Sequence, residues 1–272
     1  MARVRNWSRR KMLSRVIRIM RRTTRPLLVT RLLEIFARLR AAELTDGVVK
    51  TVGLTVHDGP FRGMTLPERP SWGEGDLLPK IAGCYEAELH PALRKALGRA
   101  PGIVVNVGCA EGYYAVGLAL ALPQAEVFAY DIRELAQEVC AEAARDNGVA
   151  GRVTIAGACS SEILRGLMAR GGRALVVMDC EGAEIELLDD GAVAVMGGCD
   201  LIVECHDSIR DGITETLRRR LAGSHTVEII GEIGREPLKI PALADLSDLD
   251  RSVAVCEFRS AKMNWLAAWA AR

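Results

Sequence analysis

Several patterns that would assign this chain to a large class of proteins are missing from its sequence. None of its eight cysteines forms a C-x-x-C pair, which argues against a disulfide framework and against a thiolate zinc site. Most of the cysteines stand inside apolar runs, so we expect buried, reduced thiols and a cytoplasmic protein. The most apolar window, residues 113–122, is about half as long as the ~20 residues that a membrane-spanning helix requires. The sequence therefore predicts no helix that crosses a membrane.

Acidic residues are almost absent from the first forty positions. Residues 1–40 contain thirteen Lys or Arg and a single acid, Glu34, so their formal charge is +12, and the remainder must carry −11 to give the net charge of +1. Such an asymmetry predicts contact with an anionic surface, which could be lipid, nucleic acid or an acidic protein. Because no aromatic platform accompanies the charge, nucleic acid is not an expected partner.

Residues 1–45 are expected to form a basic helical arm. Apolar residues recur at helical spacing in residues 8–24 and again between Leu32 and Leu39, with Pro26 between the two stripes. The arm could lie on an anionic membrane at its inner face. It could equally pack on the body, or on a second subunit in a homodimer. Its Arg-rich, acid-poor composition also resembles a mitochondrial transit peptide.

Residues 46–100 are expected to lead into the main domain. Short β-prone runs around the turn signal H-D-G-P-F-R-G predict a small hairpin over 48–66. Residues 67–80 are rich in proline, glycine and charge, which predicts a loop. Residues 85–97 have the apolar periodicity of a helix.

Residues 101–260 alternate between strand-like and helix-like segments, which is typical of an α/β fold with a parallel sheet and helices on both faces. We expect seven strands, mostly parallel. The last strand should be antiparallel, because residues 235–250 before it contain no helix-length segment. Residues 261–272 are expected to form a C-terminal helix. The predicted strands cover residues 102–108, 126–132, 152–157, 174–180, 200–206, 225–233 and 252–258. The predicted helices between them cover residues 112–122, 134–147, 160–170, 183–196 and 212–222.

A turn rich in small residues follows the first of these strands. In V-V-N-V-G-C-A-E-G-Y-Y, Gly108, Ala110 and Gly112 would let the backbone turn sharply and approach a ligand closely. Twenty-three positions after Gly108, the second strand ends at Asp131, whose carboxylate could bind both hydroxyls of a ribose. Together these features predict a nucleoside pocket at the carboxyl edge of the sheet. The alternative is purely structural: a tight turn, with Asp131 capping the next helix.

S-adenosylmethionine (SAM) fits such a pocket better than a dinucleotide does. The dinucleotide fingerprint G-x-G-x-x-G would require a small residue at the position of Tyr113. Glu111 would also repel a pyrophosphate, whereas a sulfonium amino acid carries a compensating positive charge. We therefore expect SAM as the cofactor and methyl transfer as the reaction.

With these motifs, residues 59–258 resemble the FkbM-type SAM-dependent methyltransferases. N-V-G-C-A-E-G-Y-Y is similar to their glycine motif, M-D-C-E-G-A-E-I-E-L-L to their D-x-E-G-x-E segment, and I-V-E-C-H-D to the acidic end of their fifth strand. The resemblance implies the Rossmann-like fold of class I methyltransferases. The chain departs from the family pattern at Asn106, where an acid is usual, and at Ala110, where a larger polar residue or a glycine is usual.

The resemblance also implies a set of cofactor contacts. The glycine motif would surround the methionine moiety, Asp131 would bind the ribose, and Cys159 and Ser160 would meet the adenine edge. Tyr85 and Glu86 would close the pocket from the preceding helix. The full expected set is Tyr85, Glu86, Asn106, Gly108, Cys109, Ala110, Glu111, Gly112, Tyr113, Tyr114, Asp131, Ile132, Ala158, Cys159, Ser160 and Asp179.

Charged side chains follow the fourth and fifth predicted strands, namely Asp179 and Glu181 after the fourth, and Glu204 and His206 at the end of the fifth. Methyl transfer to a hydroxyl needs a positioned acceptor and a group that removes its proton. We expect His206 or Asp179 to be this base, with Glu181 and Glu204 orienting the acceptor. Alternatively, His206 only braces the strand end. No metal is expected, although Asp179, Glu204 and His206 could together hold Mg²⁺.

Relatives of the FkbM type mostly resemble O-methyltransferases. The resemblance therefore implies O-methylation of a sugar, a glycolipid or another hydroxylated small molecule, with a small-molecule or glycan acceptor as the partner. N-methylation of an amine or a protein remains open, as does a non-catalytic SAM-binding module.

Overall fold

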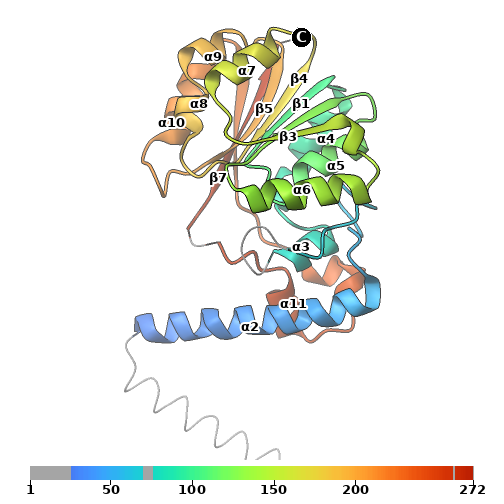
Figure 1. The fold of residues 1–272 in the computed structure, drawn as a ribbon. Helices are drawn as coiled ribbons and strands as arrows, with labels where there is room; N and C mark the ends of the chain where they lie inside the picture. Colours follow the sequence, from blue (N-terminus) through green and yellow to red (C-terminus); the bar gives the residue numbers. More distant parts are fainter. Residues whose placement is uncertain (1–25, 70–75, 260, 272) are drawn as a thin grey trace, which may run out of the picture.

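The computed structural model describes residues 26–69, 76–259 and 261–271. Figure 1 shows one twisted sheet with helices on both faces, as the alternation of segments predicts. Seven strands form the sheet in the order β3-β2-β1-β4-β5-β7-β6, and β7 runs antiparallel to both of its neighbours. The predicted Rossmann-like α/β fold is confirmed. The strands are β1 Ile103–Val107, β2 Glu126–Tyr130, β3 Val153–Ala156, β4 Ala174–Met178, β5 Cys199–Cys205, β6 His225–Gly231 and β7 Asn264–Ala270.

Two groups of helices cover the two faces of the sheet. Helices α4, α5 and α6 pack on one core, and α7 to α10 pack on the other. Because both faces are covered, β1, β4 and β5 are buried along their whole length, which explains their nearly continuous apolar sequences. These helices are α4 His90–Gly98, α5 Tyr113–Ala121, α6 Glu134–Asp146, α7 Ser161–Met168, α8 Glu184–Leu187, α9 Asp190–Ala194 and α10 Ile213–Leu221.

The order of the strands changes direction between β1 and β4. The chain passes from β1 outward to β2 and β3, whereas from β4 it passes outward to β5 on the other side. Ligands of open α/β sheets bind in the crevice at this switch point, beyond the carboxyl ends of the strands. The loops 108–112 and 179–183 meet there and form the candidate site.

The last strand lies later in the sequence than we expected. Residues 252–258, predicted as the antiparallel strand, instead contain the end of helix α11 (Asp248–Ala254), which begins at an N-cap where the Ser247 hydroxyl accepts a hydrogen bond from the Asp250 amide at 3.2 Å. The predicted C-terminal helix over 261–272 is wrong, because residues 264–270 are β7. β7 is buried on both faces and consists mostly of alanine and tryptophan, so it lacks the alternation that marks a half-buried strand.

The predicted hairpin over 48–66 is wrong at its start and confirmed in part over 54–66. Helix α2 runs from Pro26 to Val52, so the arm extends beyond residue 45. Residues 54–66 pair antiparallel through a bridge between Thr55 and Thr65 and through backbone hydrogen bonds, from the Leu66 amide to the Leu54 carbonyl at 2.7 Å and from the Val56 amide to the Met64 carbonyl at 2.8 Å. Leu44 and Val48 lie one turn apart on the buried face of α2, and their packing outweighs the β propensity of the valine-rich run. The first predicted helix of the arm, over residues 8–24, lies outside the described residues.

Four other predicted segments differ in detail from the structure. The lead-in helix is divided into a 3₁₀ turn, η1 (Ala87–Leu89), and α4, after a left-handed residue at Glu86 (φ 46°). The helix predicted over 183–196 is divided into α8 and α9, because the Asp189 carboxylate caps α9 at the Ala192 amide. The loops 67–80 and 235–250 contain short helices, namely α3 Leu77–Ala82, η3 Pro237–Lys239 and η4 Pro241–Leu243, besides the start of α11; a further turn, η2, covers Ala150–Arg152.

Two further expectations, about the cysteines and about membrane-spanning helices, can be compared with the structure. All eight cysteines are free, and five of them are buried. Across residues 26–69, 76–259 and 261–271, no helix is both long enough and apolar enough to cross a bilayer.

Candidate functional site

Gly108 brings the ends of β1 and β4 into close contact. Its φ of 77° is left-handed, and a Cβ atom there would lie 1.6 Å from the carbonyl oxygen of Asp179. Only glycine allows both the conformation and this approach without strain. Its amide donates a hydrogen bond to the Tyr130 carbonyl at 2.8 Å, which ties the turn to β2 as well. The turn is therefore held against both neighbouring strands.

Asp131 joins this turn to the end of β2. Its Oδ2 accepts a hydrogen bond from the Ala110 amide at 3.0 Å, and its Oδ1 accepts one from the Arg133 amide at 2.9 Å. Nε of Arg133 also donates to Oδ1 at 3.3 Å, and because a carboxylate has about four acceptor positions, these three bonds leave room for one more from a ligand. The amide of Arg133 precedes α6, so Asp131 also braces the start of that helix.

A cavity of about 370 Å³ opens beyond Gly108 and Asp131. Its walls come from the loops after β1, β2, β3 and β4 and from α3. Ile132, at its rim, is 80% exposed, so its side chain is open to a ligand in this cavity. The expected cofactor residues that line this cavity are Tyr85, Gly108, Ala110, Glu111, Asp131, Ile132, Ala158, Cys159 and Asp179.

The other expected cofactor residues lie behind or beside the cavity wall. Asn106 is buried in β1, where its side-chain amide donates to the Val177 carbonyl at 3.3 Å, and Ser160 caps α7. Tyr113 packs edge-on against Tyr85, which does line the cavity. Residues adjacent in the sequence to a ligand-facing residue often point into the core, which a motif cannot show. The residues of this kind are Asn106, Cys109, Gly112, Tyr113 and Tyr114, whereas Glu86 lines the second cavity described below and Ser160 is exposed.

Lys80 is the main cavity residue that the sequence did not suggest. It is buried in α3 and forms ion pairs with Glu111 and, at 2.6 Å, with Asp76. Burial opposes its charge, but the two carboxylates together raise the pKa of Lys80 above its usual range. Glu111 is thus neutralised by a partner, which weakens the expectation that it would repel a pyrophosphate. The other cavity residues that we did not predict as cofactor contacts are Asp76, Val107, Tyr130, Arg133, Gly157, Cys180, Glu181, Ala183 and Leu187.

A second cavity, of about 480 Å³, adjoins the first. Asp76, Tyr85, Asp179 and Glu181 line both cavities. The second cavity extends from there to the end of β5, to α2 and to the segment before β7. All four expected catalytic residues, His206, Asp179, Glu181 and Glu204, line it, and they come from two different strand ends. The remaining lining residues are Arg38, Glu86, Ser208, Ile209, Glu257, Phe258, Arg259 and Met263.

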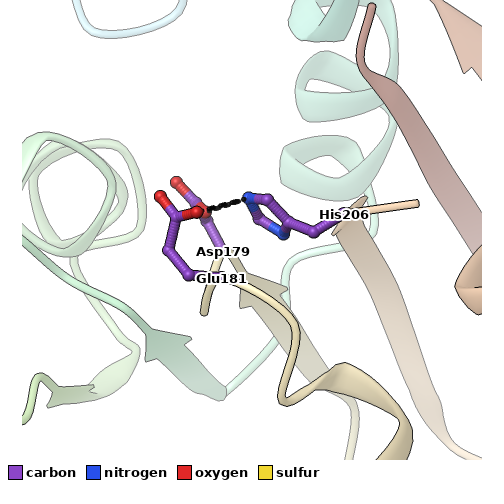
Figure 2. Close-up of side chains that lie close together, drawn as sticks. All are labelled: Asp179, Glu181 and His206. Carbon is purple, nitrogen blue, oxygen red and sulfur yellow. Dashed lines mark ion pairs between the residues drawn. The ribbon is translucent and has the colours of Figure 1, made fainter. Parts of the chain in front are cut away.

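The three acids of the D-x-E-G-x-E segment gather around His206. Glu184, fully buried, places Oε1 2.6 Å from Nδ1 of the ring. On the other side of the ring, Nε2 lies 3.4 Å from Oδ1 of Asp179 and 3.5 Å from Oε2 of Glu181. Figure 2 shows the two carboxylates facing the edge of the imidazole. Burial alone would lower the pKa of His206, but the bond to Glu184 and the nearby acids raise it.

Asp179 and Glu204 form a carboxyl pair beside this histidine. Burial and the charge of Asp179 raise the pKa of Glu204 to about 11. Burial, together with the charge of Glu181, raises the pKa of Asp179 to about 6, although His206 opposes the shift. At neutral pH Glu204 is therefore protonated and donates a hydrogen bond to the Asp179 carboxylate. Two acids in similar positions thus hold different protonation states.

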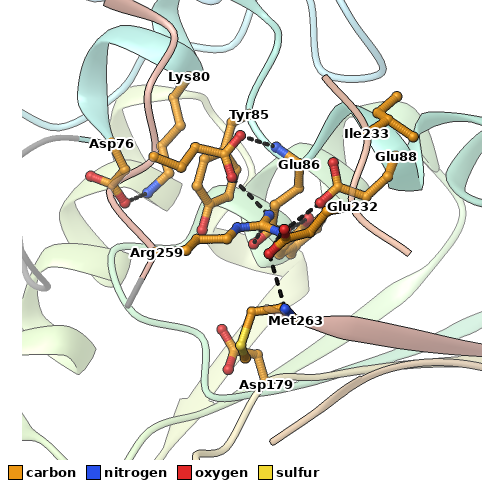
Figure 3. Close-up of polar contacts among 12 residues, drawn as sticks. Asp76, Lys80, Tyr85, Glu86, Glu88, Asp179, Glu232, Ile233, Arg259 and Met263 are labelled. Atoms are coloured by element: carbon orange, nitrogen blue, oxygen red, sulfur yellow. Dashed lines mark hydrogen bonds and ion pairs between the residues drawn. The ribbon is translucent and has the colours of Figure 1, made fainter. Parts of the chain in front are cut away.

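A buried network of two arginines and four glutamates supports the far wall of the second cavity. Nη1 of Arg259 lies 2.7 Å from Oε1 of Glu88, and its Nη2 lies 2.7 Å from Oε2 of Glu257. Arg235 pairs with the same two glutamates. Figure 3 shows the Arg259 side chain extending towards the glutamates beside Tyr85. The remaining acids of the network are Glu86, whose carboxylate accepts a hydrogen bond from the Tyr114 hydroxyl, and Glu232.

The magnesium alternative gains no support from Glu204. Donor atoms of Asp179, Glu181 and His206 lie within 4.8 Å of one another, and Glu204, which we expected as a ligand, is not part of this group. Acidic side chains often gather without an ion, and an imidazole is a poor ligand for Mg²⁺, which prefers oxygen.

Comparison with known proteins gives only distant likenesses. No protein-family model and no curated protein matches the chain. An O-methyltransferase of tomaymycin synthesis from Streptomyces achromogenes, solved with SAM, is 19% identical over 71% of this chain and 83% of its own, with a TM-score of 0.48. A putative O-methyltransferase from Klebsiella pneumoniae is 14% identical over 93% and 94%, with a TM-score of 0.47, and a methyltransferase from Geobacter sulfurreducens is 16% identical over 65% and 75%, with a TM-score of 0.40. Likeness at this level carries no argument about activity, so the function must be argued from the site.

Proposed function

We propose that this protein is a SAM-dependent methyltransferase that methylates a hydroxyl group of a sugar, a glycolipid or another small molecule. One observation carries the proposal: Asp131 ends β2 at the wall of a cavity whose floor is the Gly108 turn. A carboxylate in this position is suited to the two hydroxyls of a ribose. SAM supplies an activated methyl group on a positively charged sulfur.

The shape and charge of the first cavity favour SAM over a dinucleotide. Its volume of about 370 Å³ is near the small end of ligand pockets, which span ~300–1,000 Å³. Asp131 and Ile132 would hold the nucleoside, and the adjoining turn at Gly108 and Ala110 would hold the amino-acid part. Asp179, at the junction with the second cavity, would favour a cationic sulfur there.

The second cavity is where we place the acceptor. Its lining meets that of the first at Asp179 and Glu181, so an acceptor in it would face a methyl donor in the first. Methyl transfer then depends mainly on how the acceptor is aligned with the methyl group, and the rigid strand ends fix that alignment. Six acids line this cavity, namely Asp76, Glu86, Asp179, Glu181, Glu204 and Glu257. Arg38, Arg259 and His206 line it as well, so a polyhydroxyl acceptor would meet both hydrogen-bond acceptors and donors there.

His206 is the proposed general base. Its Nδ1 is engaged by Glu184, so in the neutral imidazole the proton sits on that nitrogen and Nε2 can accept a proton from the acceptor. Because the neighbouring acids raise the pKa of His206, this basic form is populated only as the pH rises through the raised value. Glu184 would stabilise the imidazolium that forms. Glu181 and Asp179 are placed to orient the hydroxyl, and the neutral Glu204 holds Asp179 in position. Asp179 is the alternative base.

The structure also suggests why D-x-E-G-x-E occurs in this segment, which is the part of the FkbM resemblance that we retain as a proposal. Asp179 and Glu181 face the junction of the two cavities, while Glu184 turns back to the imidazole. The motif thus supplies two orienting acids and one acid that fixes the base.

Calorimetry with SAM and with NAD tests the cofactor. We expect SAM to bind with micromolar affinity and NAD not to bind measurably. Asp131→Asn should weaken SAM binding at least tenfold, because the loss of a charged hydrogen bond costs about 1.4 kcal/mol or more. Asp207→Asn is the matched control, since Asp207 also follows a strand and accepts a backbone amide, from Thr214 at 3.2 Å, but lines neither cavity. Equal affinity of wild type and Asp131→Asn for SAM would refute the proposal.

N-methylation of an amine is the second candidate. The acid-rich lining of the acceptor cavity favours it, because a cationic amine would be attracted there. Incubation with methyl-labelled SAM and matched pairs of amino and hydroxy sugars separates O-methylation from N-methylation. If the label appears on nitrogen only, N-methylation is the function and O-methylation is rejected. No transfer to any compound of either type, with SAM bound, would favour a non-catalytic SAM-binding module.

We also propose that the basic residues 1–40 bring the protein to an anionic surface. The formal charge of this segment, +12, supports the proposal. A homodimer held by the same segment is the competing proposal.

A further inference from the structure

Helix α2 has two apolar faces, and the protein body covers only one of them. Ala41, Leu44 and Val48 are buried in the C-terminal half of α2. Figure 1 shows α11 and α3 above that half, while the N-terminal half extends away from them. The covered face explains why the helix is attached to the body. It leaves the opposite face to be explained.

The second face is a continuous apolar stripe on the N-terminal half. Leu28, Leu32, Ile35, Phe36 and Leu39 follow the spacing i, i+4, i+7, i+8, i+11, which places them along one side of a helix. Phe36 is 63% exposed and Leu39 58%, and Leu33 beside them is 65% exposed. Large apolar side chains are exposed singly on most proteins, but a contiguous stripe marks an interaction surface. We call these five residues the α2 stripe.

The positive charge next to the α2 stripe indicates the kind of partner that the stripe binds. The stripe begins directly after residues 1–25, which contain ten Lys or Arg and no acid, and Arg31 lies within it in sequence. A stripe of this kind next to concentrated positive charge is the pattern of a helix that lies in the interface of an anionic bilayer.

The same helix forms part of the acceptor cavity. Arg38, one residue before Leu39, lines the second cavity, where its guanidinium stacks 4.7 Å over the ring of Phe258 and donates to the Phe258 carbonyl at 3.1 Å. A surface that holds the α2 stripe would therefore lie next to this wall of the acceptor cavity.

We propose that the α2 stripe docks on an anionic lipid surface. Docking places the acceptor cavity beside the lipid headgroups, so the acceptor is presented by the membrane; this consequence rests on the proposed function, whereas docking itself does not. The partner is a bilayer with negatively charged headgroups.

Sedimentation of the full chain with vesicles tests the docking. Vesicles of 30% phosphatidylglycerol in phosphatidylcholine should bind the wild type, pure phosphatidylcholine should bind it far less, and 0.5 M salt should weaken binding to the charged vesicles. Phe36→Ser with Leu39→Ser removes two exposed apolar side chains without changing charge, and should weaken binding about ten- to hundredfold. Both side chains are exposed, so circular dichroism melting should be unchanged.

The control variant is Leu135→Ser with Val195→Ser, which alters two apolar side chains exposed elsewhere, on α6 and after α9. It should bind vesicles as the wild type does. The inference fails if the wild type does not bind charged vesicles, or if the α2 stripe variant binds them equally well. It also fails if sedimentation velocity shows a wild-type dimer that the stripe variant dissociates, since a second copy is then the occupant. SAM calorimetry on the same samples shows separately whether the proposed function stands.

Discussion

His206 and Glu184 are joined by a hydrogen bond of 2.6 Å between Nδ1 and Oε1, with both side chains buried. The bond fixes which ring nitrogen faces the cavity, and it holds the pKa of His206 above its usual range. Glu184 is therefore a positioning residue: it acts through the histidine and lines neither cavity.

Glu184→Gln should lower the pKa of His206 by at least about one unit, because the amide keeps a hydrogen bond but removes the negative charge. Titration of the imidazole by NMR measures this, with His206→Gln to assign the signal. The raised pKa means that the ion pair stabilises the fold fully below the ordinary histidine pKa and that this stability is lost as pH rises through the raised value. That pH dependence of unfolding should shrink in Glu184→Gln. An unchanged titration would show that Glu184 does not control the ring.

SAM affinity should fall as pH drops below about 6, because burial raises the pKa of Asp179 to about 6 and protonation removes a charge that attracts the sulfonium. We expect about a fivefold loss between pH 8 and pH 5. The demethylated product has a neutral sulfur, so its affinity should change less over the same range. Asp179→Asn should remove the difference between the two ligands. Calorimetry at the two pH values would contradict the assignment if both ligands lost affinity equally.

Gly108→Ala should destabilise the protein by about 3 kcal/mol or more, since it combines a left-handed backbone with a Cβ atom 1.6 Å from a backbone oxygen of Asp179. Gly166→Ala is the control: Gly166 lies within α7 with open space around it, and alanine there should stabilise by up to about 1 kcal/mol. Urea unfolding compares the two. Equal stability of both variants would mean that the close approach of β1 and β4 is not a constraint.

Lys80→Met should destabilise the protein by about 3 kcal/mol, because it leaves Glu111 buried without its ion-pair partner. Adding Glu111→Gln should recover much of the loss, since a neutral amide in the same place costs less. The double-mutant cycle by urea unfolding gives the coupling between the two residues. Additive losses would argue against a direct interaction.

The sequence predicted the strands β1 to β6 and missed β7, which lies between β5 and the edge strand β6. Continuous apolar runs bounded by small residues define β1 and β4 without ambiguity, since they are too short for helices. Residues 264–270 have the same burial on both faces, but their alanines favour a helix, and only contact with β5 and β6 makes them a strand.

The sequence predicted those residues of the candidate site that directly follow a strand. Asp131, Asp179 and His206 each follow an apolar strand, so their convergence at one edge could be expected. Lys80 could not be found in this way, because its role depends on α3 folding against the turn that contains Glu111. Glu184 stood in a recognised motif, yet only the structure shows that it faces the imidazole rather than the cavity.

The position of β7 sets the order in which the sheet can be completed. It lies between β5 and β6, so β6 has no edge to join until residues 264–270 have left the ribosome. During synthesis the edges of β5 and β6 stay exposed together, which is when a growing chain is most prone to pair wrongly with another.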